Sequence, residues 1–222
     1  MVFLISVLLG LAMGSGTVFS LHYGAGNHVA LRRSIFSSFV LIGIVTLILN
    51  VAVFIWLDPI LRLLQVPQDI YGMMRSYLWI IFCGIVFTFI YNFYASLLRA
   101  VGDSVTPLWF LAVSVVLNIA LDLFFILQLD WGIQGAASAT VLAQGVAALG
   151  IIIYTYRRRP ELRWHHEDMC FDRTCLKEIA SFSTLTCVQQ SVMNLGILMV
   201  QGLVNSFGTA VMAAFAAAVK ID

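Results

Sequence analysis

Asp122 is the acidic residue that lies in the middle of an apolar segment. Ten of the eleven Asp and Glu residues lie in connectors, near the ends of apolar segments or at the last position, whereas Asp122 lies in the middle of an apolar segment. At the centre of a membrane-spanning helix an ionised carboxylate costs about 2.5–3.5 kcal/mol, so it faces a protein interior or a wet cavity and marks a candidate functional site. A protonated Asp that bonds a neighbouring helix is the alternative.

Polar side chains accompany Asp122 on the same helical face. Asn118 and Ser114 precede it at intervals of four residues, which places all three on one side of a helix. Asp122 precedes the short turn around Leu129–Gly132, and Thr140 follows that turn by the same number of residues. In helices, both residues would therefore lie roughly 13 Å from the turn. A carboxylate, an amide carbonyl and a hydroxyl suit a small cation, and they suit a proton equally well. The spacing therefore predicts a cation-binding or coupling site for H⁺ or Na⁺ at Asn118, Asp122 and Thr140.

Three amides form a second set of candidates in the last long apolar segment. Gln189, Gln190 and Asn194 stand at membrane depth, where amides either bond across helices or line a cavity. Together with Ser114 they are candidate substrate-cavity residues.

The elements that must position these residues are membrane-spanning helices. Hydrophobic residues make up 61% of the sequence and charged residues 10%, against about 45–50% and about 25% in soluble domains. A helix needs about 20 mostly apolar residues to cross a hydrocarbon core. The expected fold class is therefore an all-α, polytopic membrane helical bundle. Its full spans are expected near Val2–Tyr23, Ile35–Leu57, Tyr77–Leu98, Pro107–Leu127, Gly132–Tyr156 and Ile179–Ser206, with a seventh helix starting at Thr209.

Basic residues alternate between the connectors. The segments 22–34, 99–106 and 157–178 hold nine of the twelve Lys and Arg residues, which places these segments in the cytoplasm. Segment 157–178 is the longest charged stretch, and it contains the helix-ending Pro160. We expect it to be a linker between an amino-terminal lobe, 1–156, and the start of a carboxy-terminal lobe, 179–222. Met1 would then begin outside without the charged region of a signal peptide, so both ends are expected to be cuts in a longer chain.

Several function classes find no support in the sequence. A net charge of +1 gives no reason to expect a nucleic-acid partner. The set His165, His166, Cys170 and Cys175 lacks a strong zinc spacing, and no disulfide, cofactor or further metal site is predicted. An intramembrane aspartyl protease needs two carboxylates, yet Asp122 stands alone, and no HExxH or GxSxG pattern occurs. The chain is therefore not expected to be an enzyme.

Four runs carry a family resemblance in a fixed order. They are Leu-Arg-Ala-Val-Gly-Asp-Ser-Val-Thr-Pro at 98–107, Leu-Asn-Ile-Ala-Leu-Asp at 117–122, Gly-Ile-Gln-Gly-Ala-Ala at 132–137 and, more loosely, His-Tyr-Gly-Ala-Gly-Asn at 22–27. In order and spacing the sequence resembles the multidrug and toxin extrusion (MATE) family of the MOP superfamily, from about helix two to the start of helix eight. The resemblance implies twelve helices in two lobes, with the first helix missing here, a central cavity and alternating access.

The resemblance also implies roles for single residues. The family's amino-lobe cation site uses an Asn and an Asp on helix five and a Thr on helix six, which match Asn118, Asp122 and Thr140. The Asp that the family uses on helix one has no counterpart here. Some relatives carry an acidic residue on helix seven, where this chain offers only Gln189 and Gln190.

The function implied by the resemblance is export of small organic cations or drugs by a cation-coupled antiporter, driven by H⁺ or Na⁺, in the bacterial cytoplasmic membrane. The expected partners are these substrates and membrane lipid, the expected state is a monomer, and the fragment alone is not expected to transport. The alternative is a lipid-linked oligosaccharide or polysaccharide flippase of related fold, which is expected to carry several arginines in its cavity. No arginine lies deep in an apolar segment here.

Overall fold

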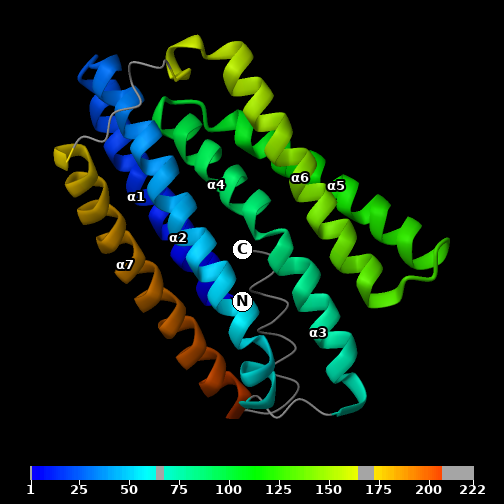
Figure 1. The fold of residues 1–222 in the computed structure, drawn as a ribbon. Coiled ribbons are helices and arrows are strands. Elements are labelled where there is room, and N and C mark those ends of the chain that lie inside the picture. Colours follow the sequence, from blue (N-terminus) through cyan, green and yellow to red (C-terminus); the bar gives the residue numbers. More distant parts are fainter. Residues whose placement is uncertain (1, 64–67, 165–172, 207–222) are drawn as a thin grey trace.

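Long helices make up almost all of the described structure. The computed structural model describes residues 2–63, 68–164 and 173–206, and these ranges contain no β-strand. The helices are α1 (Val2–Gly24), α2 (His28–Leu63), α3 (Gln68–Cys83), α4 (Ile85–Ala100), α5 (Val105–Leu127), α6 (Gly132–Arg158), the 3₁₀ helix η1 (Pro160–Leu162) and α7 (Arg173–Ser206). The α-helices lie roughly side by side as a bundle (Figure 1). The predicted all-α class is confirmed.

Five segments of the described chain are long and apolar enough to span a membrane. They are Ile5–Gly24, His28–Pro59, Ile70–Ala100, Val105–Leu127 and Gly132–Arg158, and they correspond to the first five predicted spans. Helix α7 exists as predicted, but its described part is not among the five. Its amides Gln189, Gln190 and Asn194 dilute the apolar character of that helix. The seventh helix predicted from Thr209 lies outside the described residues.

Helix α2 begins earlier than the apolar pattern predicts. It starts at His28 rather than near Ile35, because Asn27 caps it with its side chain. The Asn27 Oδ1 accepts the backbone N–H of Ala30 at 3.0 Å, which satisfies one of the free donors of the first turn. The polar first turns of α2 carry Arg32 and Arg33 to the end of the bundle, where hydropathy alone predicts only a connector.

Gly84 divides the third predicted span into α3 and α4. Its backbone stays in the right-handed helical region, with φ −77° and ψ −10°, so the two helices continue as one span. A Cβ on Gly84 would meet Cγ2 of Val141 in α6 at 2.4 Å. The glycine therefore permits a close approach of α6 to this point of the bundle.

The predicted linker 157–178 contains helical residues at both ends. Its first residues complete α6 and form η1, and its last residues begin α7 at Arg173 rather than near Ile179. The Trp164 ring packs on α2, with its centroid 5.9 Å from that of Phe36 and 5.2 Å from that of Phe39. Residues 165–172 lie outside the described residues. The division into two lobes stays a prediction.

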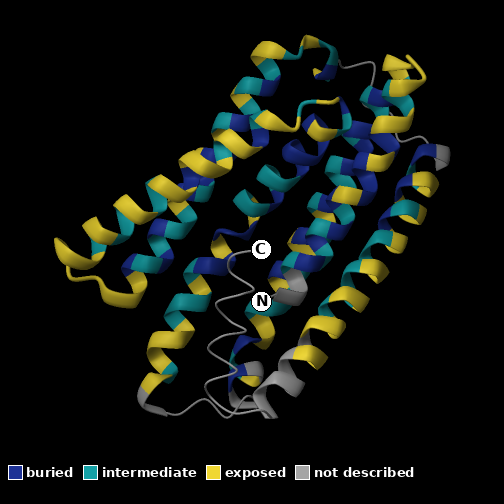
Figure 2. Cartoon of the chain, turned by 180° about the vertical axis from the view of Figure 1, so that it is seen from behind, coloured by how far each residue is buried: buried dark blue, intermediate teal, exposed yellow. Residues whose placement is uncertain are grey.

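An aromatic core joins α1, α2 and α4. Phe93 of α4 is fully buried, and its ring centroid lies 5.9 Å from that of Phe19 in α1 and 5.2 Å from that of Phe39 in α2, both edge-on. Phe89, one turn before Phe93, lies 5.3 Å from Phe39. Edge-on pairs are the favoured geometry of aromatic rings. Buried residues follow the inner faces of the bundle, whereas much of α5 and of the outer faces is exposed (Figure 2).

Helices α1 and α7 pack at backbone contact. A Cβ on Gly14 would lie 2.4 Å from the Cα of Ser183, and one on Gly10 would lie 2.9 Å from the Cα of Cys187. The Ser183 hydroxyl donates to the carbonyl of Leu11 at 3.3 Å. In a membrane, close packing of small residues and interhelical hydrogen bonds hold helices together. The glycines of the first helix therefore bring α7 against it.

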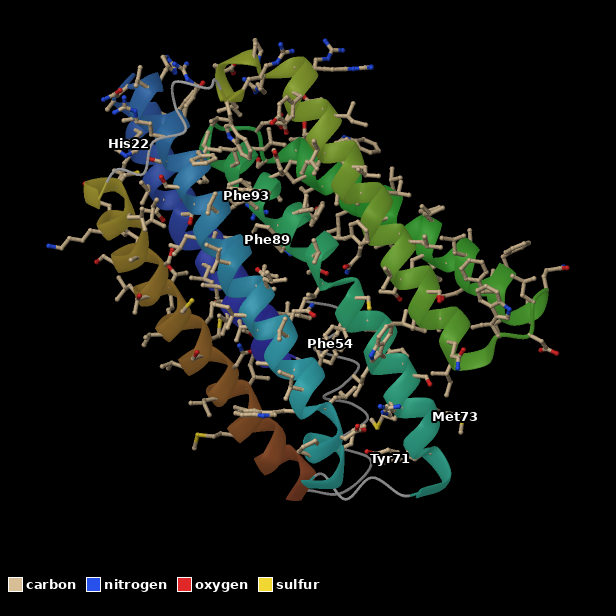
Figure 3. The ribbon with its side chains drawn as sticks, viewed as in Figure 1. His22, Phe54, Tyr71, Met73, Phe89 and Phe93 are labelled. Atoms are coloured by element: carbon tan, nitrogen blue, oxygen red, sulfur yellow. The ribbon has the colours of Figure 1, made fainter. Side chains whose placement is uncertain are left out.

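The basic connectors share one end of the bundle. The α1–α2, α4–α5 and α6–η1 connections lie together at the end marked by His22, whereas Tyr71 and Met73 mark the opposite end (Figure 3). At that opposite end, Arg75 is paired with Asp58 at 2.9 Å. The arrangement agrees with the alternation of charge along the sequence. Which end faces the cytoplasm stays a prediction.

Candidate functional site

A cavity of about 350 Å³ lies between α1, α4, α5 and α6. Its polar lining residues are Thr88, Tyr91 and Asn92 of α4, Ser114 and Asn118 of α5, and Thr140 and Gln144 of α6. Apolar residues, among them Ile5 and Leu9 of α1, complete the wall. None of the described residues that line the cavity is Asp, Glu, Lys or Arg. The cavity can therefore hold a ligand against hydroxyl and amide groups, and it presents no full charge.

The structure brings Ser114, Asn118 and Thr140 to this cavity. The Asn118 Nδ2 donates to the Thr140 hydroxyl at 3.3 Å, across the contact between α5 and α6. The Thr140 hydroxyl in turn donates to the Ala136 carbonyl of its own helix at 3.0 Å. Ser114 is buried one turn before Asn118. The spacing around the turn predicts equal depth for Asp122 and Thr140, whereas the hydrogen bond seen between the two helices joins Thr140 to Asn118, one turn before Asp122.

Asp122 lies one turn beyond Asn118 and is not among the residues that line the cavity. Its Oδ1 is inaccessible to solvent and has no hydrogen-bond partner among the described residues. A buried carboxylate oxygen without a partner is costly, and a bound cation or a proton relieves that cost. The unpartnered Oδ1 is thus the feature of this region that points to a charge-compensating ligand.

The amides of α7 do not line the cavity. Gln189 is exposed and Gln190 is half-buried. Asn194 donates to the Ser6 hydroxyl of α1 at 2.7 Å and to the Gln190 carbonyl at 2.9 Å. Of the two uses considered for these amides, bonding across helices is the one seen at Asn194.

Sequence reasoning missed the cavity wall formed by α4 and the second turn of polar residues on α6. The Thr88 hydroxyl donates to Gln144 Oε1, and Asn92 Nδ2 donates to the Thr88 carbonyl at 2.8 Å. Thr88 and Asn92 are four residues apart, as are Thr140 and Gln144. The same spacing rule that selected Ser114, Asn118 and Asp122 could have found these two pairs.

The cysteines and histidines give no metal centre in the described part of the chain. No group of three or more His, Cys, Asp or Glu residues is positioned to hold an ion there. Cys175 is buried, and its sulfur lies 2.9 Å from the Ser34 hydroxyl. His165, His166 and Cys170 lie outside the described residues.

The sequence profile of the MatE family matches residues 1–124. The chain belongs to the MATE family. The probable multidrug resistance protein YpnP of Bacillus subtilis (strain 168) is 32% identical to this MATE chain over 225 residues, which cover 98% of the chain and 48% of YpnP. The probable multidrug resistance protein NorM of Thermotoga maritima is 28% identical over 198 residues, which cover 87% of the chain and 42% of NorM. The MATE chain spans about half the length of the curated relatives it matches.

Solved MATE structures share the fold. The Vibrio cholerae MATE transporter VcmN in its bent form superposes with a TM-score of 0.86 at 25% identity, over 99% of this chain and 50% of VcmN. A MATE in complex with MaL6 superposes with a TM-score of 0.90 at 22% identity, over 99% of this chain and 49% of that protein. With its apolar helices, the MATE chain is part of an integral, multi-pass protein of the bacterial membrane.

Proposed function

We propose that this MATE chain forms part of an antiporter that exports small organic cations by alternating access, driven by an inward flow of H⁺ or Na⁺. The relatives named as multidrug resistance proteins support drug export as the transport class. The observation that carries the coupling step is the buried, unpartnered Oδ1 of Asp122, one turn from the Asn118–Thr140 contact.

The coupling ion binds at Asp122 with help from Asn118 and Thr140. A proton converts the carboxylate to a neutral acid, and Na⁺ neutralises it while the amide carbonyl and the hydroxyl complete an oxygen shell. Either event removes the cost of the buried charge and changes how α5 packs on α6. Ion binding and substrate binding are then coupled through the position of one helix, and the coupling acts equally in both directions.

The cavity is the proposed place of the organic substrate. Its hydroxyls and amides can accept hydrogen bonds from a protonated amine, while Ile5, Leu9 and Leu111 contact the apolar part of the molecule. Of the described residues that line the cavity, Tyr91 alone is titratable, so no nucleophile and base pair is available. We therefore propose binding and transport without chemical conversion. A flippase for anionic lipid-linked sugars would need cationic lining residues, which this set does not contain.

The test is dye efflux from vesicles that hold the natural-length protein carrying this sequence, with Na⁺ and pH gradients imposed separately. Asp122→Asn keeps the shape of the side chain and removes its titratable charge, so gradient-driven efflux should be lost. Folding and insertion should survive, because Asn is cheaper to bury in a membrane than an ionised Asp. Asp130→Asn, at the exposed turn after α5, is the matched control and should pump normally.

Normal gradient-driven pumping by Asp122→Asn would contradict Asp122 as the coupling residue. A variant that does not fold would instead assign Asp122 to helix packing.

A further inference from the structure

Helix α5 carries Asn118 and Asp122 but is held mainly by one neighbour. Of its described residues only Pro107 and Ser114 are buried, and α6 is the helix against which it mainly packs. The rest of its described residues are half-buried or exposed. The place of the coupling-ion site in the bundle therefore depends on how α5 is fixed to α6.

Asp103, in the connection before α5, joins the start of α5 to the end of α6. Its Oδ1 accepts the backbone N–H of Thr106 at 3.1 Å, and its Oδ2 accepts the Thr106 hydroxyl at 2.9 Å. From α6 and its C-terminal cap, the Tyr154 hydroxyl donates to Oδ2 at 3.4 Å and Arg159 Nη2 lies 3.8 Å from Oδ2. We call these four residues the Asp103 clamp.

The Asp103 clamp is more than a surface ion pair. The Asp103 side chain is 12% exposed and the Arg159 side chain is 31% exposed. Exposed pairs contribute about 0–1 kcal/mol, because solvent screens them and both side chains must be ordered. Here one partly buried carboxylate accepts several hydrogen bonds from two helices, and hydrogen bonds to a charged group are roughly twice as strong as neutral ones.

Further contacts extend the clamp toward the cavity. The Phe110 ring lies edge-on to the Tyr154 ring with centroids 6.1 Å apart. A Cβ on Gly150 would meet the Phe110 ring at 2.6 Å, so Phe110 lies directly on the backbone of α6. The Tyr91 hydroxyl, which lines the cavity, donates to the Pro107 carbonyl at 2.8 Å. The first turns of α5 are thus fixed on the side that faces the bundle.

The clamp and the Asn118–Thr140 contact are connected by two uninterrupted helices. Asn118 follows Thr106 by twelve residues, and Thr140 precedes Tyr154 by fourteen. At the rise of an α-helix these separations are about 18 Å and about 21 Å. A continuous helix of this length is nearly rigid along its axis. A displacement of the start of α5 relative to α6 therefore also displaces Asn118.

We propose that Asp103 is a positioning residue for the coupling-ion site. It fixes the register of α5 on α6 in which Asn118 meets Thr140 and the Asp122 Oδ1 is buried, and it thereby sets the affinity of the site for the ion. Asp103 does not touch the ion. This inference rests on the proposed function and adds to it a second, distant determinant of ion affinity.

The first test separates ion affinity from transport capacity in the natural-length protein. Asp103→Asn keeps an oxygen for the Thr106 N–H and removes the charge that faces Arg159. We expect the concentration of Na⁺ or H⁺ that gives half-maximal dye efflux to rise by about 3- to 10-fold, with the maximal rate nearly unchanged. Asp103→Ala removes both carboxylate oxygens and should raise the half-saturating ion concentration further. Asp130→Asn, at the opposite end of the same pair of helices, should change neither quantity.

The second test measures the register of the two helices directly. Spin labels at Ile119 and Leu142, which are exposed and flank Asn118 and Thr140, report the distance between α5 and α6 when native cysteines are replaced. The distance distribution should be narrow in the parent and in Asp130→Asn, and it should shift or broaden in both Asp103 variants. If Asp103→Ala does not fold, Asp103→Asn decides, since it keeps the first turn of α5.

Unchanged distances in Asp103→Asn would overturn the proposal. Ion-dependent efflux with an unchanged half-saturating concentration would also overturn it and would leave the proposed function standing. Efflux by the parent that depends on neither ion contradicts the proposed function, and the spin-label distances still decide whether Asp103 positions α5.

Discussion

The Asn118–Thr140 contact orients two oxygens without using up their capacity to bind a cation. The Thr140 hydroxyl accepts one hydrogen bond from Asn118 and donates its own hydrogen to Ala136, which leaves one of its two lone pairs. Asn118 takes part through its nitrogen, so its carbonyl oxygen is not the atom engaged in this contact. Such preorganisation reduces the entropy that ordering the two side chains would otherwise cost when an ion binds.

Thr140→Val tests this orientation at a single atom. Valine keeps the β-branched shape and removes the hydroxyl, so both a potential ion ligand and the partner of Asn118 are lost. A hydrogen bond of this kind contributes about 1 kcal/mol, and we expect the half-saturating ion concentration for efflux to rise about 5- to 10-fold. Ser138→Ala is the control, because the Ser138 hydroxyl bonds the Gln134 carbonyl of its own helix at 2.8 Å. Equal half-saturating concentrations in the two variants would contradict the role given to Thr140.

Spacing along the sequence predicted a polar contact between α5 and α6 because the two helices form one hairpin. Equal distances from the short turn predicted Asp122 and Thr140 at one depth, whereas the hydrogen bond in the structure joins Thr140 to Asn118, one helical turn away from Asp122. The four-residue spacing could have marked Thr88 and Asn92 as one polar face, but nothing in the sequence says that their helix lies across the cavity from α5. Gln144, the partner of the Thr88 hydroxyl, is 56 residues from Thr88, and only the packing of α4 on α6 brings the two together.

At the scale of helices, two glycine contacts decide how close the neighbours come. Because Gly84 has no Cβ, Val141 of α6 can pack directly on the α3–α4 junction. Because Gly14 has no Cβ, Ser183 of α7 can pack directly on α1. A run of small residues such as Gly10, Ala12, Gly14 and Gly16 permits close helix packing in a membrane, but the sequence does not say which helix is the neighbour. The start of α2 was missed for a different reason, since it depends on a side-chain cap at Asn27 and not on hydropathy.

Gly14→Ala tests the α1–α7 contact. The added Cβ would lie 2.4 Å from the backbone Cα of Ser183, and a backbone atom cannot rotate away as a side chain can. The two helices must separate, and we expect the free energy of unfolding in detergent to fall by about 1–3 kcal/mol. Gly196→Ala, also in this helix pair, has no atom within 4 Å of its added Cβ and should be neutral or stabilising by about 0.5–1 kcal/mol. Equal thermal midpoints for Gly14→Ala and the parent would contradict the tight contact.

For the whole molecule, the outer surface and the two ends follow from composition more directly than the interior does. Large apolar side chains are exposed along α5, among them Trp109 and Val116, which would promote aggregation in water and suits contact with lipid in a bilayer. The charged connectors cannot enter the hydrocarbon, so they collect at the ends. The cavity could not be predicted in this way, because its volume depends on how four helices pack.

The orientation of the bundle gives the last prediction. The end marked by His22 carries the basic α1–α2 and α6–η1 connections, and basic loops are retained in the cytoplasm. A single cysteine introduced as Arg163→Cys should therefore react with a membrane-impermeant maleimide only after the cells are opened. One introduced as Gln128→Cys, at the exposed turn that leads from α5 to α6, should react in intact cells. Both cysteines should react in detergent, which shows that each side chain is accessible. The opposite pattern in intact cells would reverse the orientation and would place the turn nearest Asp122 in the cytoplasm. An ion entering from outside would then have to reach the site from the end at which Asp103 joins α5 to α6.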